Sequence, residues 1–264
     1  MSVWKLELMD ALNSISSEEH AEAWDNGGIQ VDAGTLEIHR ILVALEITTE
    51  VIKEARELEA DYIVVHHPLI FEPLKSVDIH EIAGSHIVQL IKSDISVYAA
   101  HTSFDLVKGG TNDYLAELLE LTMVRKMQHL EPSDEFGVVG ELKAPGLLLD
   151  VIEKVSEALE LDRKALKIVG DLTGDVRTVG IVTGAGGRYV EDAILNGCDV
   201  FITGDLKYHD ARLAKEAGLA VIDAGHYGTE KSFVPNMAAK LKKALGPDVE
   251  IIESMVDIDP FTTI

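Results

Sequence analysis

Cysteine is nearly absent from this sequence, because Cys198 is the only one among 264 residues. A single cysteine excludes an intrachain disulfide and fits a protein of a reducing compartment. Cys198 stands at the start of an expected strand without a nearby histidine, and the chain contains no G-x-S-x-G motif. Nucleophilic catalysis by a cysteine or by a serine of that motif therefore has no support.

Basic residues are also scarce, since 23 lysines and arginines face 46 aspartates and glutamates and leave a formal net charge of -23. A surface of this sign repels phosphate backbones and anionic lipid, so we expect neither a nucleic-acid partner nor membrane binding. No apolar run approaches the ~20 residues that span a bilayer. Residues 1–10 lack the basic and apolar regions of a secretory signal, which makes a cytoplasmic location the expectation.

What the sequence does contain is an alternation of apolar runs and amphipathic segments. Residues 41–48 read as a buried strand, 48–60 as a helix, and 61–71 as a second strand with its exit. Strands and helices that alternate at this spacing predict an α/β fold, with mainly parallel sheets that helices cover on both faces. The tail at 249–261 reads as a final strand that could return to the first sheet.

This pattern occurs twice along the chain. Residues 178–209 repeat residues 40–71 with an offset of 138, and the next strand follows in both copies with an offset of 125. Any two βαβ units share a general likeness, but the matching order and spacing favour an internal duplication into two intertwined α/β units. We expect the first domain to comprise residues 1–125 with 232–264, and the second to comprise 126–231.

Histidines and carboxylates gather where the expected strands end. His66 and His67 close one strand, and the spacing histidine–x–x–x–carboxylate follows the third strand of each copy, at 101–105 and 226–230. Ligands of parallel α/β sheets bind at the carboxyl ends of the strands. Imidazole and carboxylate groups together suit a divalent first-row metal ion. The sequence therefore predicts a metal site, in a cleft at these strand ends.

The predicted metal ligands are three imidazoles and two carboxylates: His66, His67, Asp105, His226 and Glu230. Adjacent residues of an extended chain point to opposite sides, so His66 and His67 would face different ions unless the backbone turns sharply. Pro68 favours the extended exit. Five protein ligands on two ions leave coordination positions open for water or substrate, which is typical of catalytic sites.

Three further residues near these strand ends have open roles. His101 could ligate a metal, or it could orient Asp105 or donate a proton; we favour the second role and predict His101 as the catalytic residue. Asp205 could line the same cleft or cap the helix that follows it. His209 could lie in the cleft or on the surface of a helix start. The GAGGR segment at 184–188 resembles a phosphate-binding loop, but a tight turn explains it equally well.

The motifs HHPLIF, HTSFD, TGDLKYH and GHYGTEK, in this order and after WDNGGIQVD, resemble those of the NIF-three-like dinuclear metal centre proteins. That family is often labelled type 2 GTP cyclohydrolase I, and the resemblance covers nearly the whole chain. It implies two similar intertwined three-layer α/β/α domains, two divalent metal ions per chain in the cleft between these domains, and a homohexamer built as a trimer of dimers. The family's metal ligands fall on the five residues predicted above. Asp32 departs from a usual glycine, and Tyr208–His209 stands where a second histidine pair sometimes occurs.

The open site and the resemblance together suggest a metal-dependent hydrolase that acts on a nucleotide or related small molecule. The alternatives are a non-catalytic metal-handling protein, as a chaperone or sensor, a regulatory protein, and a scaffold that uses metal for assembly. Iron, zinc, manganese, cobalt and nickel all accept this ligand set, so the residues do not define the metal. They do not define the small-molecule substrate either.

Overall fold

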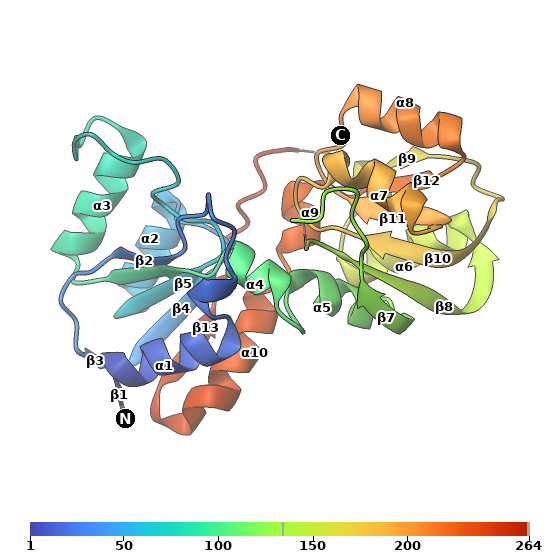
Figure 1. The fold of residues 1–264 in the computed structure, drawn as a ribbon. Helices are drawn as coiled ribbons and strands as arrows, with labels where there is room; N and C mark the ends of the chain where they lie inside the picture. The colour runs from blue at the N-terminus through green and yellow to red at the C-terminus, as the bar shows by residue number, and fades with distance from the viewer. Residues whose placement is uncertain (134, 263–264) are drawn as a thin grey trace. The chain divides into compact units, whose positions relative to one another are not determined.

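The computed structural model describes residues 1–133 and 135–262, which divide into two compact units (Figure 1). Unit 1 comprises Met1–Val107 and Phe233–Ile258, and unit 2 comprises Lys108–Ser232 with the last residues from Asp259. Residues 108–125, which the sequence pattern placed in the first domain, belong to unit 2. The reason is apolar packing, because the helix that begins at Thr111 contributes to the core of unit 2.

Unit 1 alternates strands and helices around one five-stranded sheet. Its elements are β1 (Val3–Trp4), α1 (Lys5–Ile15), η1 (Glu18–His20), β2 (Gly28–Val31), β3 (Glu37–Ile38), β4 (Arg40–Ala44), α2 (Thr49–Glu57), β5 (Tyr62–Val65), α3 (Ile82–Lys92), β6 (Ser96–Ala99), α4 (Thr102–Leu106), α10 (Phe233–Leu245), η4 (Gly246–Asp248) and β13 (Glu250–Glu253). The sheet order is β13-β4-β5-β6-β2, with β2 antiparallel to β6 and the other pairs parallel. Pairing of β13 with β4 confirms the predicted return of the tail to the first sheet.

Helices cover both faces of this sheet, because the side chains of each strand alternate between the two faces. Leu42 and Ala44 of β4 share a core with Val51 and Ile52 of α2 and with Leu90 of α3. On the opposite face, α10 packs against β4 and β13, and α1 packs against α10. Unit 1 therefore has the predicted three layers.

Unit 2 has a six-stranded sheet with a parallel centre. Its elements are α5 (Thr111–Leu118), β7 (Thr122–Lys126), β8 (Val138–Leu147), α6 (Leu148–Ala158), η2 (Arg163–Ala165), β9 (Lys167–Val169), β10 (Asp175–Ile181), η3 (Gly187–Tyr189), α7 (Val190–Leu195), β11 (Val200–Thr203), α8 (Tyr208–Ala217), β12 (Ala220–Asp223) and α9 (His226–Glu230). In the order β7-β8-β10-β11-β12-β9, strands β10, β11 and β12 are parallel and their outer neighbours are antiparallel. "Mainly parallel" thus describes the sheet of unit 1, whereas the sheet of unit 2 is mixed.

Strand β11 illustrates why unit 2 also has three layers. Ile202 shares one core with Val151 of α6. Phe201, whose side chain points to the other face, shares a second core with Ala193 of α7 and Ala214 of α8. The α/β class is confirmed in both units.

Equivalent contacts recur in the two sheets. Asp61 Oδ2 accepts hydrogen bonds from two successive backbone N–H groups at the start of β4, at 2.6 and 3.0 Å. At the predicted offset of 138, Asp199 Oδ2 accepts the same pair at the third residue of β10 and the fourth, at 2.9 and 2.8 Å. In the third strands, β6 and β12, the strand register makes Ser96 equivalent to Ala220, which is an offset of 124 residues. The second copy has one extra residue after this strand, Gly225, so the offset between His101 and His226 is the predicted 125. These repeated contacts support an internal duplication.

Among the described residues, no helix combines the length and the apolar character that crossing a membrane requires. The helix α10, for example, has 13 residues. A span needs about 20 residues at the rise of an α-helix.

Candidate metal centre

Unit 1 brings three of the predicted residues together beyond the carboxyl ends of β5 and β6. The candidate ligand atoms of His66, His67 and His101 lie within 4.8 Å of one another. His66 is fully buried, and its ring lies 4.9 Å from the ring of Phe233 between centroids. Parallel strand ends meet at one edge of a sheet, which is why residues far apart in the sequence form this histidine group.

The backbone bends at the histidine pair instead of continuing in an extended conformation. The backbone N–H groups of His66 and His67 both donate to the carbonyl oxygen of Leu45, at 3.0 and 2.9 Å. The two rings therefore lie close together, with centroids 5.1 Å apart and planes at 41°. The expected extended exit is wrong here, because two successive N–H groups can reach one carbonyl only if the chain turns. The alternative that the sequence left open, a sharp turn of the backbone, is the one observed, so the two side chains need not point to opposite sides.

Asp105 lies one helical turn beyond His101, in α4, and its side chain is buried. Its Oδ1 atom is 3.6 Å from Nε2 of His66. Burial of a carboxylate costs free energy unless hydrogen bonds or a positive charge compensate. The combination of a buried carboxylate and a cluster of imidazoles is therefore suited to a cation.

Asp25 holds His101 in place, although the sequence indicated only a turn at this position. Its side chain is fully buried, with Oδ1 2.8 Å from Nδ1 of His101. Its Oδ2 accepts hydrogen bonds from the backbone N and from Oγ1 of Thr102, at 3.0 and 2.5 Å. Burial by itself would raise the pKa of Asp25, but the hydrogen bonds from His101 and Thr102 outweigh it and hold the pKa below its usual value. The carboxylate is therefore charged at neutral pH. The WDN motif was the one sequence signal that could have identified it.

Unit 2 brings the second predicted pair together on the short helix α9. His226 and Glu230 are four residues apart on one helix face, with Nε2 of His226 3.0 Å from Oε2 of Glu230. Nδ1 of His226 lies 2.8 Å from Oδ2 of Asp205. Asp205 thus orients His226; it does not cap α8, whose N-cap residue is Lys207.

Two glycines allow the chain to approach this pair closely. A Cβ atom on Gly204 would lie 2.6 Å from the backbone nitrogen of His226. A Cβ atom on Gly184 would clash with Oε1 of Glu230, and the φ angle of Gly184 is +67°. The GAGGR segment therefore serves as a tight turn packed against Glu230.

The histidines of the group in unit 1 and His226 of unit 2 share one feature, which is that Nδ1 faces an oxygen acceptor. Nδ1 of His66 lies 2.9 Å from the carbonyl oxygen of Ala100, and Nδ1 of His67 lies 3.4 Å from Oε2 of Glu46. The contacts of His101 and His226 with aspartates complete the set. Because carbonyl and carboxylate oxygens only accept, Nδ1 carries the hydrogen in the neutral rings of His66, His67 and His101, and Nε2 carries the lone pair that ligates a metal. Both ring nitrogens of His226 face carboxylate oxygens, and a cation held by Nε2 and Glu230 would leave the hydrogen on Nδ1. This donor set fits a divalent first-row ion.

Other residues that the sequence offered as alternatives lie outside these groups. His209 is exposed on α8, where the surface alternative placed it. Cys198 is buried, and burial raises the pKa of its thiol to about 12. A thiol with this pKa is not a nucleophile at neutral pH, which agrees with the sequence argument.

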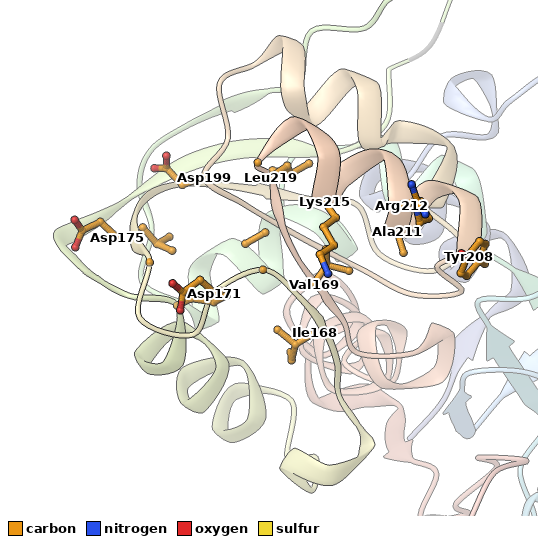
Figure 2. A pocket seen from close by; sticks show the side chains of 16 residues that line it. Ile168, Val169, Asp171, Asp175, Asp199, Tyr208, Ala211, Arg212, Lys215 and Leu219 are labelled. Atoms are coloured by element: carbon orange, nitrogen blue, oxygen red, sulfur yellow. The ribbon is translucent and has the colours of Figure 1, made fainter.

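A cavity of about 780 Å³ lies in unit 2 at the opposite ends of the parallel strands (Figure 2). Asp199, which precedes β11, and Ala220, the first residue of β12, are in its lining. Figure 2 places Asp171 and Asp175 on one side of the cavity and Arg212 of α8 on the other. None of the described residues that line it is a histidine. The imidazole and carboxylate groups at the carboxyl ends of the strands therefore remain the stronger candidate site.

Comparisons with known proteins agree with this fold. Residues 5–260 match the sequence profile of a family described as Duf34/NIF3 (NGG1p interacting factor 3). A Clostridium perfringens protein named "GTP cyclohydrolase 1 type 2 homolog" is 37% identical over 257 residues, which cover 97% of each chain. A Helicobacter pylori protein named "GTP cyclohydrolase 1 type 2" is 32% identical over 228 residues, which cover 86% of this chain and 87% of its own.

Solved structures extend the likeness to three dimensions. A Bacillus cereus protein related to NIF3 matches with a TM-score of 0.90 and 25% identity, over 100% of this chain and 99% of its own. The Staphylococcus aureus protein SA1388 also matches with a TM-score of 0.90, at 26% identity over 99% of each chain. The two-sheet α/β architecture is thus that of a known group of structures.

Proposed function

Because the chain belongs to the Duf34/NIF3 family, we propose that it binds a pair of divalent metal ions and is a metal-dependent hydrolase. We further propose that its substrate is a nucleotide or a related small molecule. One observation carries the metal proposal: each histidine of the candidate centre has Nδ1 against an acceptor oxygen. The names of the curated relatives, GTP cyclohydrolase 1 type 2 and its homologues, support the nucleotide class.

The proposed metal ligands are the five residues that the sequence predicted. They are His66, His67 and Asp105 of unit 1 and His226 and Glu230 of unit 2. Iron, zinc, manganese, cobalt or nickel would accept these imidazole and carboxylate groups. Bound ions would supply Lewis acidity and would lower the pKa of water toward ~7. Five protein ligands for two ions leave coordination positions for substrate.

His101 is the residue that we propose to hold and move a proton during the reaction. Asp25 fixes the orientation and tautomer of its ring, so that Nε2 is the atom that exchanges the proton. The charge on Asp25 also stabilises the imidazolium that forms when His101 takes up a proton. A ligand role is the alternative, because His101 belongs to the histidine group. The substitution His101→Gln separates the two roles. If the variant loses turnover but keeps its full metal content, His101 has the proton role; if it loses metal, His101 is a ligand.

Metal analysis combined with a turnover screen tests the hydrolase. The stripped protein, reloaded with Mn²⁺ or Zn²⁺, should hold two ions per chain and should be screened against nucleotides, phosphoesters and cyclic amides. His67→Ala and Glu230→Ala should reduce the metal content and abolish turnover. His80→Ala, at an exposed histidine of unit 1, is the matched control and should change neither. Turnover that survives both ligand substitutions would refute the proposal.

A non-catalytic metal-handling or regulatory protein is the second candidate, and the exposure of one histidine favours it. The side chains of His226 and Asp205 are 37% and 54% exposed. A ligand that solvent reaches can pass its ion to another protein. For this role we expect that the protein shows no turnover and transfers Zn²⁺ to an apo-metalloprotein within seconds. An ion that does not exchange over hours would exclude it.

We also propose that the chain forms a homohexamer, a trimer of dimers, as the family resemblance implies. Sedimentation velocity at micromolar concentration, with and without EDTA, tests this assembly. A hexamer that persists in EDTA would separate assembly from metal binding, and a monomer under both conditions would refute the proposal. Cytoplasmic placement stays a prediction from the sequence.

A further inference from the structure

Two aromatic side chains lie half-exposed beside the histidine group of unit 1. Trp24 is 54% exposed and Phe71 is 52% exposed. Their ring centroids are 6.0 Å apart, with ring planes at 59°. The centroid of the His101 ring is 6.0 Å from that of Trp24 and 6.4 Å from that of Phe71. Large aromatic surface that remains open to water next to a polar site is typical of a ligand-binding surface.

The two loops that carry these rings are tied to each other. Asn26 Nδ2 donates a hydrogen bond to the carbonyl oxygen of Ile70, at 2.5 Å. The backbone N–H of Ile70 donates to Oε1 of Gln30, at 3.1 Å, and Gln30 Nε2 donates to the carbonyl oxygen of Asn26, at 2.6 Å. Gln30 is buried, whereas the bond from Asn26 to Ile70 lies at the surface. The backbone segments that carry Trp24 and Phe71 are therefore linked to each other.

The loop of Trp24 also positions the imidazole of the candidate centre. Asp25, the next residue, binds Nδ1 of His101 and both polar groups of Thr102. One turn of the chain thus carries both the indole ring and the carboxylate that positions the histidine. A ligand that lies against Trp24 has a defined position relative to His101.

We propose that Trp24 and Phe71 form a stacking platform for a flat heteroaromatic ring of the substrate, whose edge lies toward His101. This inference rests on the proposed function and narrows the substrate class to compounds with a planar nitrogen heterocycle, such as a purine. Two rings tilted at 59° offer a ligand one face contact and one edge contact, and aromatic groups prefer such offset and edge-to-face contacts. The continuity of the platform with the histidine group favours a small ligand over a second copy of the chain.

Fluorescence of Trp24 tests the platform directly. The chain has two tryptophans, so Trp4→Phe leaves Trp24 as the only one. This protein would be titrated with guanosine, adenosine and ribose in EDTA. We expect saturable quenching by both nucleosides and none by ribose, because only the nucleosides carry a flat ring.

Matched substitutions then assign the binding to the platform. Phe71→Leu should weaken nucleoside binding roughly 5- to 150-fold, the range for loss of one stacked aromatic side chain. Phe71→Tyr keeps the ring and should bind as the unchanged protein does. Phe261→Leu, at an exposed phenylalanine of unit 2, should have no effect. Circular dichroism of Phe71→Leu checks that the fold is intact.

Two results would overturn the platform: nucleosides that leave Trp24 fluorescence unchanged up to millimolar concentration, and equal affinity in Phe71→Leu and unchanged protein. A change in Trp24 fluorescence that depends on protein concentration and not on nucleoside concentration would also overturn the platform. It would show that a second copy of the chain covers Trp24 and Phe71. Because EDTA is present, ring binding is measured apart from metal chemistry. Nucleoside binding without any turnover would support the stacking platform and contradict the hydrolase proposal. Turnover without nucleoside binding would support the hydrolase proposal and contradict the platform.

Discussion

Replacement of Asp25 by asparagine tests whether a buried carboxylate positions the imidazole of the candidate centre. One oxygen of Asp25 faces Nδ1 of His101 at 2.8 Å, and the other accepts two hydrogen bonds from Thr102. Asparagine has nearly the same shape but only one acceptor oxygen. If that oxygen keeps the bonds from Thr102, the amide NH₂ group meets the N–H of His101, and two donors then face each other.

The expected effect follows from the loss of one hydrogen bond to a charged group. Such a bond contributes about 1.5–3 kcal/mol, and we take about 2 kcal/mol for the contact with His101. At 1.4 kcal/mol per factor of ten, a loss of about 2 kcal/mol from the step in which His101 exchanges a proton is a roughly 30-fold lower turnover. Because His101 is not among the five proposed ligands, metal binding should not change; a metal affinity weakened roughly 10- to 100-fold, as is typical when a residue that orients a ligand is lost, would support the ligand role of His101 instead.

Turnover of the metal-loaded protein measures this loss, and competition with a chromophoric chelator for Zn²⁺ measures metal binding separately. Asp32→Asn is the matched control, because Asp32 forms an exposed ion pair with Lys5 at 2.6 Å and lies in the same unit. An exposed pair contributes about 0.2–1 kcal/mol to stability, so Asp32→Asn should leave both turnover and Zn²⁺ affinity unchanged. Equal turnover in the Asp25→Asn, Asp32→Asn and unchanged proteins would refute the positioning role of Asp25.

Three further predictions concern pH, packing and the thiol. Burial opposes the charge on Asp25, but the hydrogen bonds from His101 and Thr102 outweigh it and hold the pKa below 3.8. The contribution of the charged Asp25 carboxylate to the free energy of unfolding is therefore complete above about pH 3.8 and is lost as the pH falls through the lower pKa of the folded protein. Asp25→Asn lacks this titrating group, so its urea midpoint should fall less steeply with decreasing pH than that of the unchanged protein. Gly204→Ala places a Cβ atom 2.5 Å from the carbonyl carbon of Gly225, so we expect a loss of about 1–3 kcal/mol in urea unfolding together with weaker metal binding. Gly218→Ala is the control, because φ there is +78° but no atom lies within 4 Å of the added Cβ atom. This control should lower stability without changing metal affinity, and equal metal affinity in both alanine variants would contradict the clash argument. Cys198, with its pKa raised to about 12 by burial, should react with a thiol reagent at pH 8 only after unfolding, and rapid reaction of the folded protein would contradict its burial.

The predicted domain boundary illustrates how far the sequence pattern reaches. Periodicity identified β4, α2, β5 and β6 and their counterparts in the second copy, and the tail strand β13 lies where the pattern placed it. It did not assign α5 to a unit, because an amphipathic helix can pack on either of two apolar sheets. Contact of Leu115 and Ala116 with the core of unit 2 decided the assignment.

The sequence by itself determined which chemical groups stand at the strand ends, because apolar runs define the strands and the residues that follow them must lie at one edge of a sheet. His66, His67, His101 and Asp105 could be named in this way, as could the pair on α9. Only the tertiary structure decided their orientation. The bend that places two adjacent imidazoles side by side depends on the carbonyl of Leu45, more than twenty positions earlier in the sequence. The partner of His101 is Asp25, which lies in a loop with no periodic pattern of its own. Hydrogen bonds between residues so far apart form only when the chain is folded, and the local spacing of residues cannot encode them.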